Sequence, residues 1–139
     1  MSQRSVSVLV VCFALVACVL CVAARASAPI PGANTGRLIE MRLAANPANY
    51  NGSCPTTIKF GGFITVCCGP NTVSYGVSRS DGGHGNGGSH NFQRPGTWRS
   101  PELTSWTLGR RGETFNGWVM IGSGNMKSNR AMFHLHCSK

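Results

Sequence analysis

Hydrophobic and polar residues alternate along most of the chain after position 36. In residues 37–43, Ile39, Met41 and Leu43 fall on one side, and Glu40 and Arg42 fall on the other. This two-residue period is typical of a half-buried strand. Further strands are predicted where similar short segments recur, at 56–66, 72–79, 91–92, 104–108, 117–121 and 131–137.

Turn residues separate these seven segments, and no helical period joins them. Gly, Pro and Asn cluster between the segments, as at Gly69-Pro70-Asn71. Short strands with such turns predict an all-β fold, an immunoglobulin-like antiparallel β-sandwich of about seven strands, with a closed barrel as the alternative. Residues 83–89 hold four glycines and no apolar residue, so we expect a mobile loop there.

Residues 1–26 have the organisation of a signal peptide. Arg4 precedes an apolar stretch from 6 to 24, and Ala24-Arg25-Ala26 provides a small-x-small cleavage site. We therefore expect a short flexible N-terminal segment at 27–36, a domain at 37–139, and secretion. Retention as a membrane anchor through residues 6–24 is the alternative, because about 20 apolar residues span a bilayer; lipidation at Cys18 is a further one.

The chain is strongly basic. It has 13 Lys and Arg against 4 Asp and Glu, and cleavage after Ala26 would leave 11 against 4. Such a charge attracts anionic partners, so we expect an acidic polysaccharide or cell surface as partner and no specific nucleic acid. The alternative is that dispersed basic side chains only maintain solubility.

Four cysteines remain after cleavage and allow three pairings. Cys54 shares the inward parity of Ile58, and Cys137 shares that of Leu135, so we predict a Cys54–Cys137 disulfide. For Cys67 and Cys68 we predict a vicinal disulfide ring, because exposed free thiols do not persist in an oxidising compartment. Reduced thiols and linkage to another chain remain alternatives.

Five motifs occur along the predicted strands: C-P-x-T-x-x-F at 54–60, T-V-x-Y at 72–75, R-S-D-G at 79–82, W-x-L-G at 106–109 and S-N-x-A-x-F-x-L-x-C at 128–137. Together they resemble a family of exported immunoglobulin-like domains that is common in bacteria and has no characterised function. The resemblance implies a sandwich, a first-to-last cysteine bridge and export, and it carries no catalytic residue. The chain departs from the family pattern at Cys67-Cys68, in the glycine-rich loop and at Pro101.

The candidate metal ligands in this sequence are histidines. His134 and His136 are two apart on the outward face of the last predicted strand, where two imidazoles can share one metal, and His84 and His90 in the loop would complete four ligands. Two solvated polar positions are the simpler interpretation. The chain has no nucleophile elbow and no neighbouring pair of carboxylates, so we predict no enzymatic activity and no cofactor.

Trp98 is the tryptophan that we predict to be exposed, whereas Trp106 and Trp118 are expected in the core. With four arginines it would form a cationic aromatic patch for an anionic polymer; these are Arg94, Arg99, Arg110 and Arg111. Asn51-Gly52-Ser53 is a glycosylation acceptor if the source is eukaryotic.

We therefore expect a secreted, non-catalytic β-sandwich protein that acts as a binding or extracellular assembly module. The alternatives are a metal-binding protein or metal-dependent enzyme that uses His134 and His136, and a secreted effector or defence protein.

Overall fold

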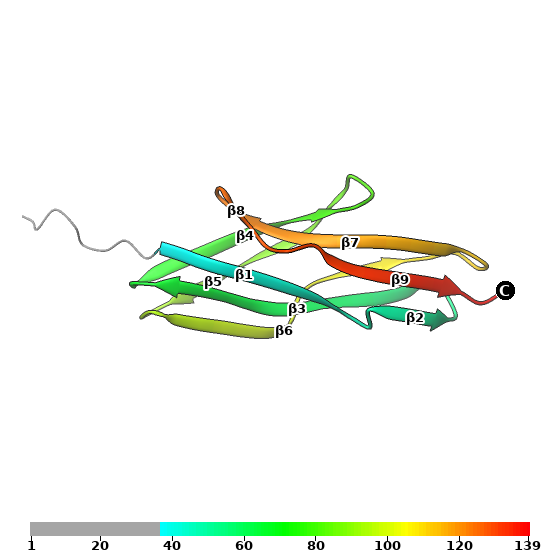
Figure 1. Ribbon diagram of the computed structural model, residues 1–139, viewed down its shortest axis with the longest axis horizontal. Helices are drawn as coiled ribbons and strands as arrows, with labels where there is room; N and C mark the ends of the chain where they lie inside the picture. The colour runs from blue at the N-terminus through cyan, green and yellow to red at the C-terminus, as the bar shows by residue number, and fades with distance from the viewer. Residues whose placement is uncertain (1–36) are drawn as a thin grey trace, which may run out of the picture. The chain divides into compact units, whose positions relative to one another are not determined.

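A computed structural model describes residues 37–139, which form nine strands and no helix (Figure 1). The predicted signal peptide at 1–26 and the segment 27–36 lie outside the described residues. Residues 37–139 contain no helix with the length and hydrophobicity that crossing a bilayer requires. The strands are β1 (Arg37–Asn46), β2 (Asn49–Gly52), β3 (Thr56–Cys67), β4 (Asn71–Arg79), β5 (His84–Phe92), β6 (Gly96–Leu108), β7 (Thr114–Ser123), β8 (Met126–Lys127) and β9 (Ala131–Cys137).

Two sheets pack face to face, which confirms the predicted all-β sandwich. The three-stranded sheet has the order β1-β3-β6, and we call it sheet A. The other has the order β2-β9-β7-β4-β5, with β8 paired to β7, and we call it sheet B. Neighbouring strands are antiparallel, except that the short β2 runs parallel to β9.

The core lies between the two sheets and is built from the inward-facing side chains of each strand. On β3, Ile58, Phe60 and Ile64 are fully buried, as their common parity predicts. The ring of Phe60 meets the edge of Phe133 on β9, with ring centroids 5.7 Å apart. Each fully buried large apolar side chain stabilises the fold by about 1.5–3 kcal/mol relative to exposure, so this interior holds the sheets together.

Two β-bulges change the predicted faces. In β1 the pairing with β3 shifts between Leu38 and Glu40, and Ile39 is left 47% exposed although its parity predicted burial. In β6 the pairing shifts around Pro101, which has no N–H to donate to a ladder. The strand nevertheless continues on both sides of Pro101, so β6 begins at Gly96 instead of at residue 104.

The glycine-rich segment is a strand and not a mobile loop. Residues 84–92 form β5, which pairs along β4 at the edge of sheet B. A Cβ on Gly85 would come within 2.8 Å of Val77, and one on Gly87 would collide with the carbonyl oxygen of Tyr75. The glycines therefore permit close pairing of β5 with β4, which the loop interpretation did not consider.

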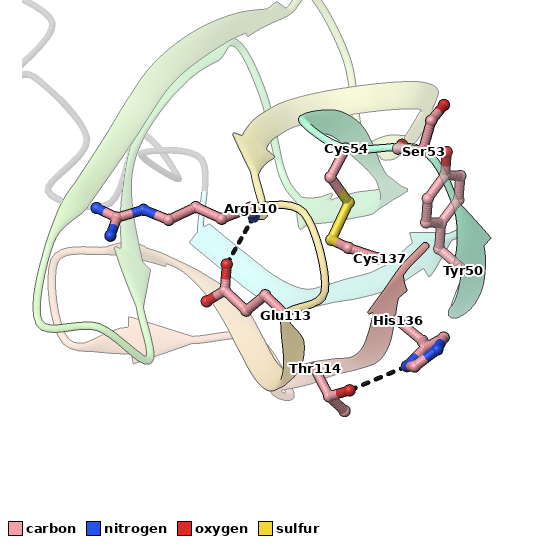
Figure 2. Close-up of a disulfide and its surroundings, with 8 residues drawn as sticks. All are labelled: Tyr50, Ser53, Cys54, Arg110, Glu113, Thr114, His136 and Cys137. Carbon is pink, nitrogen blue, oxygen red and sulfur yellow. Dashed lines mark hydrogen bonds between the residues drawn. A yellow bond between two sulfur atoms is a disulfide. The ribbon is translucent and has the colours of Figure 1, made fainter. Parts of the chain in front are cut away.

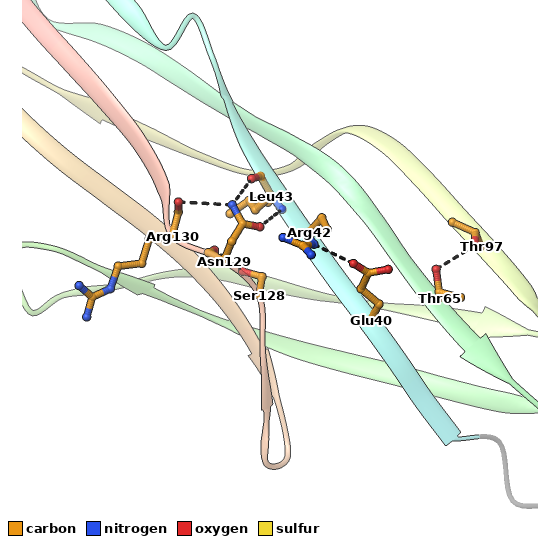
Figure 3. A network of polar contacts seen from close by, with 8 residues as sticks. All are labelled: Glu40, Arg42, Leu43, Thr65, Thr97, Ser128, Asn129 and Arg130. Carbon is orange, nitrogen blue, oxygen red and sulfur yellow. Dashed lines mark hydrogen bonds and ion pairs between the residues drawn. The ribbon is translucent and has the colours of Figure 1, made fainter.

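Asn129 closes part of the free edge of β1 (Figure 3). The N–H of Leu43 donates to Asn129 Oδ1 at 3.0 Å, and Asn129 Nδ2 donates to the carbonyl of Leu43 at 2.8 Å. The amide thus takes the place of a neighbouring strand. It also ties the segment before β9 to sheet A, because β1 belongs to that sheet.

Candidate binding surfaces and the cysteine sites

The disulfide Cys54–Cys137 is present, as predicted, and joins the segment after β2 to the end of β9 (Figure 2). It connects residues 83 positions apart, with 5.5 Å between their Cα atoms. Cys137 is fully buried. The bridge therefore fastens the first third of the domain to its last strand.

Gly109 allows the turn between β6 and β7 to pass over this bridge. Its φ is +96°, a conformation that side-chain-bearing residues rarely adopt. A Cβ at this position would lie 2.7 Å from the sulfur of Cys137 and 2.8 Å from that of Cys54. Both the backbone angle and the available space thus require glycine at this position.

Cys67 and Cys68 are free thiols, so the predicted vicinal ring is not formed. Neighbouring strand residues normally point to opposite faces, but Cys68 has a φ of 58° and its sulfur lies 2.6 Å from that of Cys67. The Cys68 thiol donates a hydrogen bond to Cys67, and this bond, together with burial, raises the pKa of Cys68 above its ordinary 9.0. A raised pKa makes Cys68 a weaker nucleophile than an ordinary cysteine.

The outer face of sheet A carries an arginine–phenylalanine row across its three strands. Phe63 on β3 is in register with Arg42 on β1 and with Arg99 on β6. The Arg99 guanidinium carbon lies 4.8 Å from the centroid of the Phe63 ring. Contacts of this kind contribute about 0.5–1 kcal/mol at exposed sites, so the row places a charged group against an aromatic surface.

Two more arginines lie beyond this row: Arg37 is the first residue of β1, and Arg94 lies in the turn between β5 and β6. Arg37 is in register with Cys67, and the Cα of Arg94 lies against Gly69, just after β3. Phe63 is four residues before Cys67, about 13 Å along an extended strand. We use the name basic surface for the set Arg37, Arg42, Phe63, Arg94 and Arg99.

The predicted patch around Trp98 does not form. Trp98 belongs to β6 and faces inward, where its ring stacks on that of His90, with centroids 4.1 Å apart and planes inclined by 4°. Arg99 pairs with Phe63 and Leu108 with Thr56, so about 23 Å separates Arg99 from the end of β6, and Arg110 and Arg111 follow that end. The bulged strand therefore turns Trp98 inward, where it is half-buried, and the two arginine pairs lie toward opposite ends of the strand.

The four predicted metal ligands divide into two groups. His134 and His136 lie on the outer face of β9, as predicted, whereas His84 and His90 lie on β5. Because β7 and β4 stand between β9 and β5 in sheet B, one ion cannot be shared by all four side chains. Within residues 37–139, no three His, Cys, Asp or Glu side chains gather around a common point.

The other two tryptophans differ in position. Trp106 is buried, as predicted, and its ring meets Phe115 and Phe133 edge-on at 5.7 Å. Trp118 is instead half-buried on the outer face of sheet B, where the guanidinium of Arg130 covers its ring at 4.5 Å. It pairs with Met132, which is exposed. The prediction that Trp118 is in the core was wrong. Residues 118–121 are all apolar, so the sequence does not show which of them face inward.

The acceptor asparagine of the predicted glycosylation motif is exposed on β2. Asn51 lies in register with His136 on the neighbouring β9. A glycan at this position would stand beside the outer face of that strand.

Three ion pairs neutralise part of the positive charge in the described domain. Arg42 pairs with Glu40 at 2.7 Å, Lys59 with Glu102 at 2.8 Å, and Arg79 with Asp81 at 3.3 Å. The hydrogen bond from Lys59 holds the pKa of Glu102 below its ordinary value. Within residues 37–139, Arg37, Arg94 and Arg99 form no ion pair, so they keep their full charge toward solvent.

Comparison with known proteins gave no match to a protein-family model, a curated protein or a solved structure.

Phe63 is the surface residue that the sequence interpretation missed. The residues at even positions in 56–66 were assigned to the core, and Phe63 has the opposite parity, so an outward aromatic side chain could have been noticed. Its position between two arginines depends on the registers of β1 and β6 against β3. Those registers include bulges that alternation alone does not reveal.

Proposed function

We propose that this protein is a secreted, non-catalytic binding module, and that its basic surface binds an acidic polysaccharide at a cell surface or in the extracellular matrix. The observation that carries the proposal is the Arg42–Phe63–Arg99 row, with the Arg99 guanidinium over the ring and paired to no acid within residues 37–139. Arg42 is paired with Glu40, whereas Arg37, Arg94 and Arg99 form no ion pair within residues 37–139. These three arginines can reach sulfate or carboxylate groups spaced along a polysaccharide chain.

The strand order supports an immunoglobulin-like description of the module. One sheet contains β1, β3 and β6, and the other contains β4, β7 and β9, which matches the division of an immunoglobulin sandwich between its A, B, E and C, F, G strands. Here the disulfide links the ends of the fold instead of the usual central strands. Secretion is supported by the signal-like residues 1–26 and by a disulfide, which persists in oxidising compartments.

A pair of double variants tests the surface assignment. R94Q/R99Q removes two charges from the basic surface, and R110Q/R111Q removes the same charge from the opposite end. Each basic side chain near an anionic surface contributes about 1 kcal/mol to binding. R94Q/R99Q should therefore bind immobilised heparin roughly 30-fold more weakly, whereas the heparin affinity of R110Q/R111Q should stay close to that of the natural protein. Binding should also weaken as salt rises.

The proposal fails if the two double variants lose affinity equally, because net charge alone would then explain binding. It also fails if heparin retention is the same at low and high salt. Circular dichroism of both variants should match the natural protein, since all four arginines are exposed.

A further inference from the structure

The outer face of β9 presents two imidazoles that neighbouring strands orient. Phe133, Leu135 and Cys137 are buried between the sheets, so His134 and His136 point to the opposite face. Their Cα atoms are about 6.7 Å apart in an extended strand. Imidazole side chains at this spacing can turn toward each other and bind one ion.

Strand β7 holds one nitrogen of each ring. His134 Nδ1 lies 2.6 Å from Asn116 Oδ1, and His136 Nδ1 lies 3.0 Å from Thr114 Oγ1. These contacts follow from register, because Asn116 pairs with His134 and Thr114 pairs with His136. The second of them is drawn in Figure 2.

The contact to Asn116 decides which nitrogen of His134 is free to bind a metal. An amide oxygen only accepts hydrogen bonds, so Nδ1 carries the proton and the lone pair is on Nε2. A Thr114 hydroxyl that accepts from His136 Nδ1 has the same effect on the second ring. Metal-binding histidines typically donate their other N–H in this way, which fixes both the tautomer and the ring orientation.

The surroundings favour a borderline transition metal over a hard cation. The neighbouring strands β2, β7 and β9 contain no Asp or Glu, and Ca²⁺ and Mg²⁺ need several oxygen ligands. Imidazole nitrogens suit Zn²⁺, Cu²⁺ and Ni²⁺. Asn49 and Asn51 flank the pair on β2, and water would complete the coordination, so the site is open.

We propose that His134 and His136 form a two-histidine site for a divalent transition metal, Zn²⁺ or Cu²⁺, with Asn116 and Thr114 as positioning residues. This site is on sheet B and does not depend on the basic surface of sheet A, so either proposal can fail without the other.

The test is titration of the protein with Zn²⁺ by calorimetry, in a C67S/C68S background that removes the competing thiols. One Zn²⁺ per chain should bind. H134Q and H136Q should each weaken binding at least tenfold, whereas H84Q, which removes an exposed histidine from β5, should leave it unchanged. N116A should weaken binding by about tenfold, the lower end of the effect of losing an orienting partner.

Electron paramagnetic resonance of the Cu²⁺-loaded protein gives a second readout. Hyperfine coupling from two nitrogen ligands should appear, and it should fall to one in H134Q or in H136Q. The proposal is overturned if no saturable binding is seen in the C67S/C68S background, or if H84Q abolishes it while H134Q and H136Q do not.

Discussion

Loss of the Cys54–Cys137 bridge should remove a large part of the stability of this domain. The perturbation is the double variant C54A/C137A. A cross-link stabilises a fold mainly by restricting the unfolded chain, and the effect grows with the length of the closed loop. The loop spans 83 residues, for which the chain-entropy relation gives about 4.5 kcal/mol at 25 °C.

That magnitude can be measured by guanidinium unfolding followed by tryptophan fluorescence. A loss of this size is a large part of the roughly 5–15 kcal/mol by which small domains are stable. Divided by the slope of the unfolding free energy against guanidinium concentration, it should lower the unfolding midpoint of C54A/C137A by roughly 1–2 M. The natural protein unfolded in the presence of a reductant should show nearly the same midpoint.

C67A/C68A is the matched control, because it removes two cysteines without opening a loop. It should change the free energy of unfolding by less than about 1 kcal/mol, since both residues lie at the end of β3 and are only half-buried. A loss below about 1 kcal/mol in C54A/C137A, or an equal loss in both double variants, would refute the role assigned to the long loop.

Three further predictions concern single positions. Gly109→Ala should destabilise the fold by more than about 1 kcal/mol and slow disulfide formation, measured by thermal unfolding and thiol titration, because its φ is +96° and both bridge sulfurs lie within 3 Å of the added carbon. Asn129→Ala should cost about 1–3 kcal/mol, because it leaves the backbone N–H and C=O of Leu43 unpaired; amide hydrogen exchange at Leu43 should accelerate. The pKa of Glu102 is lowered in the fold, so its ionised carboxylate stabilises the folded state. This contribution to the free energy of unfolding is complete above the ordinary pKa of 4.5 and disappears as pH falls through the lower pKa of the folded state. Lys59→Gln should therefore make the stability of the domain less dependent on pH below 4.5, and an unchanged acid-unfolding curve would contradict the assignment.

Alternation predicted the fold where strands are regular. β3 is continuous and carries Ile58, Phe60, Ile64 and Val66 inward as expected. The prediction was wrong at Ile39, where one extra residue in β1 reverses the face. Because the side-chain period of a strand is two, one extra residue reverses the face of the residues before it; Met41 and Leu43 after the bulge keep their predicted inward positions. No residue type in this segment marks the position of the bulge.

Local composition was misleading in β5 and in the first half of β6. Residues 84–92 are rich in glycine, asparagine and serine, which are typical of turns, yet pairing with β4 makes them a strand. Trp98 stands between Pro95 and Pro101 and was assigned to a connection, whereas the strand passes through the second proline at a bulge. In both places tertiary pairing outweighs propensity.

The candidate sites were accessible from the sequence only in part. Outward parity placed His134 and His136 correctly, but the partners Asn116 and Thr114 depend on the register between β7 and β9. The arginines were recognised as a class, but their division between two ends of the sandwich follows from the length of β6. Pairing across strands therefore decides which charged residues act together.

The most direct test of the proposed function is an NMR titration of the ¹⁵N-labelled protein with a short heparin oligosaccharide. The account predicts that amide shifts concentrate at Arg37, Arg42, Phe63 and Arg99, with little change in the turn at Arg110. Shifts confined to that turn and the C-terminus, or spread evenly over both sheets, would contradict it.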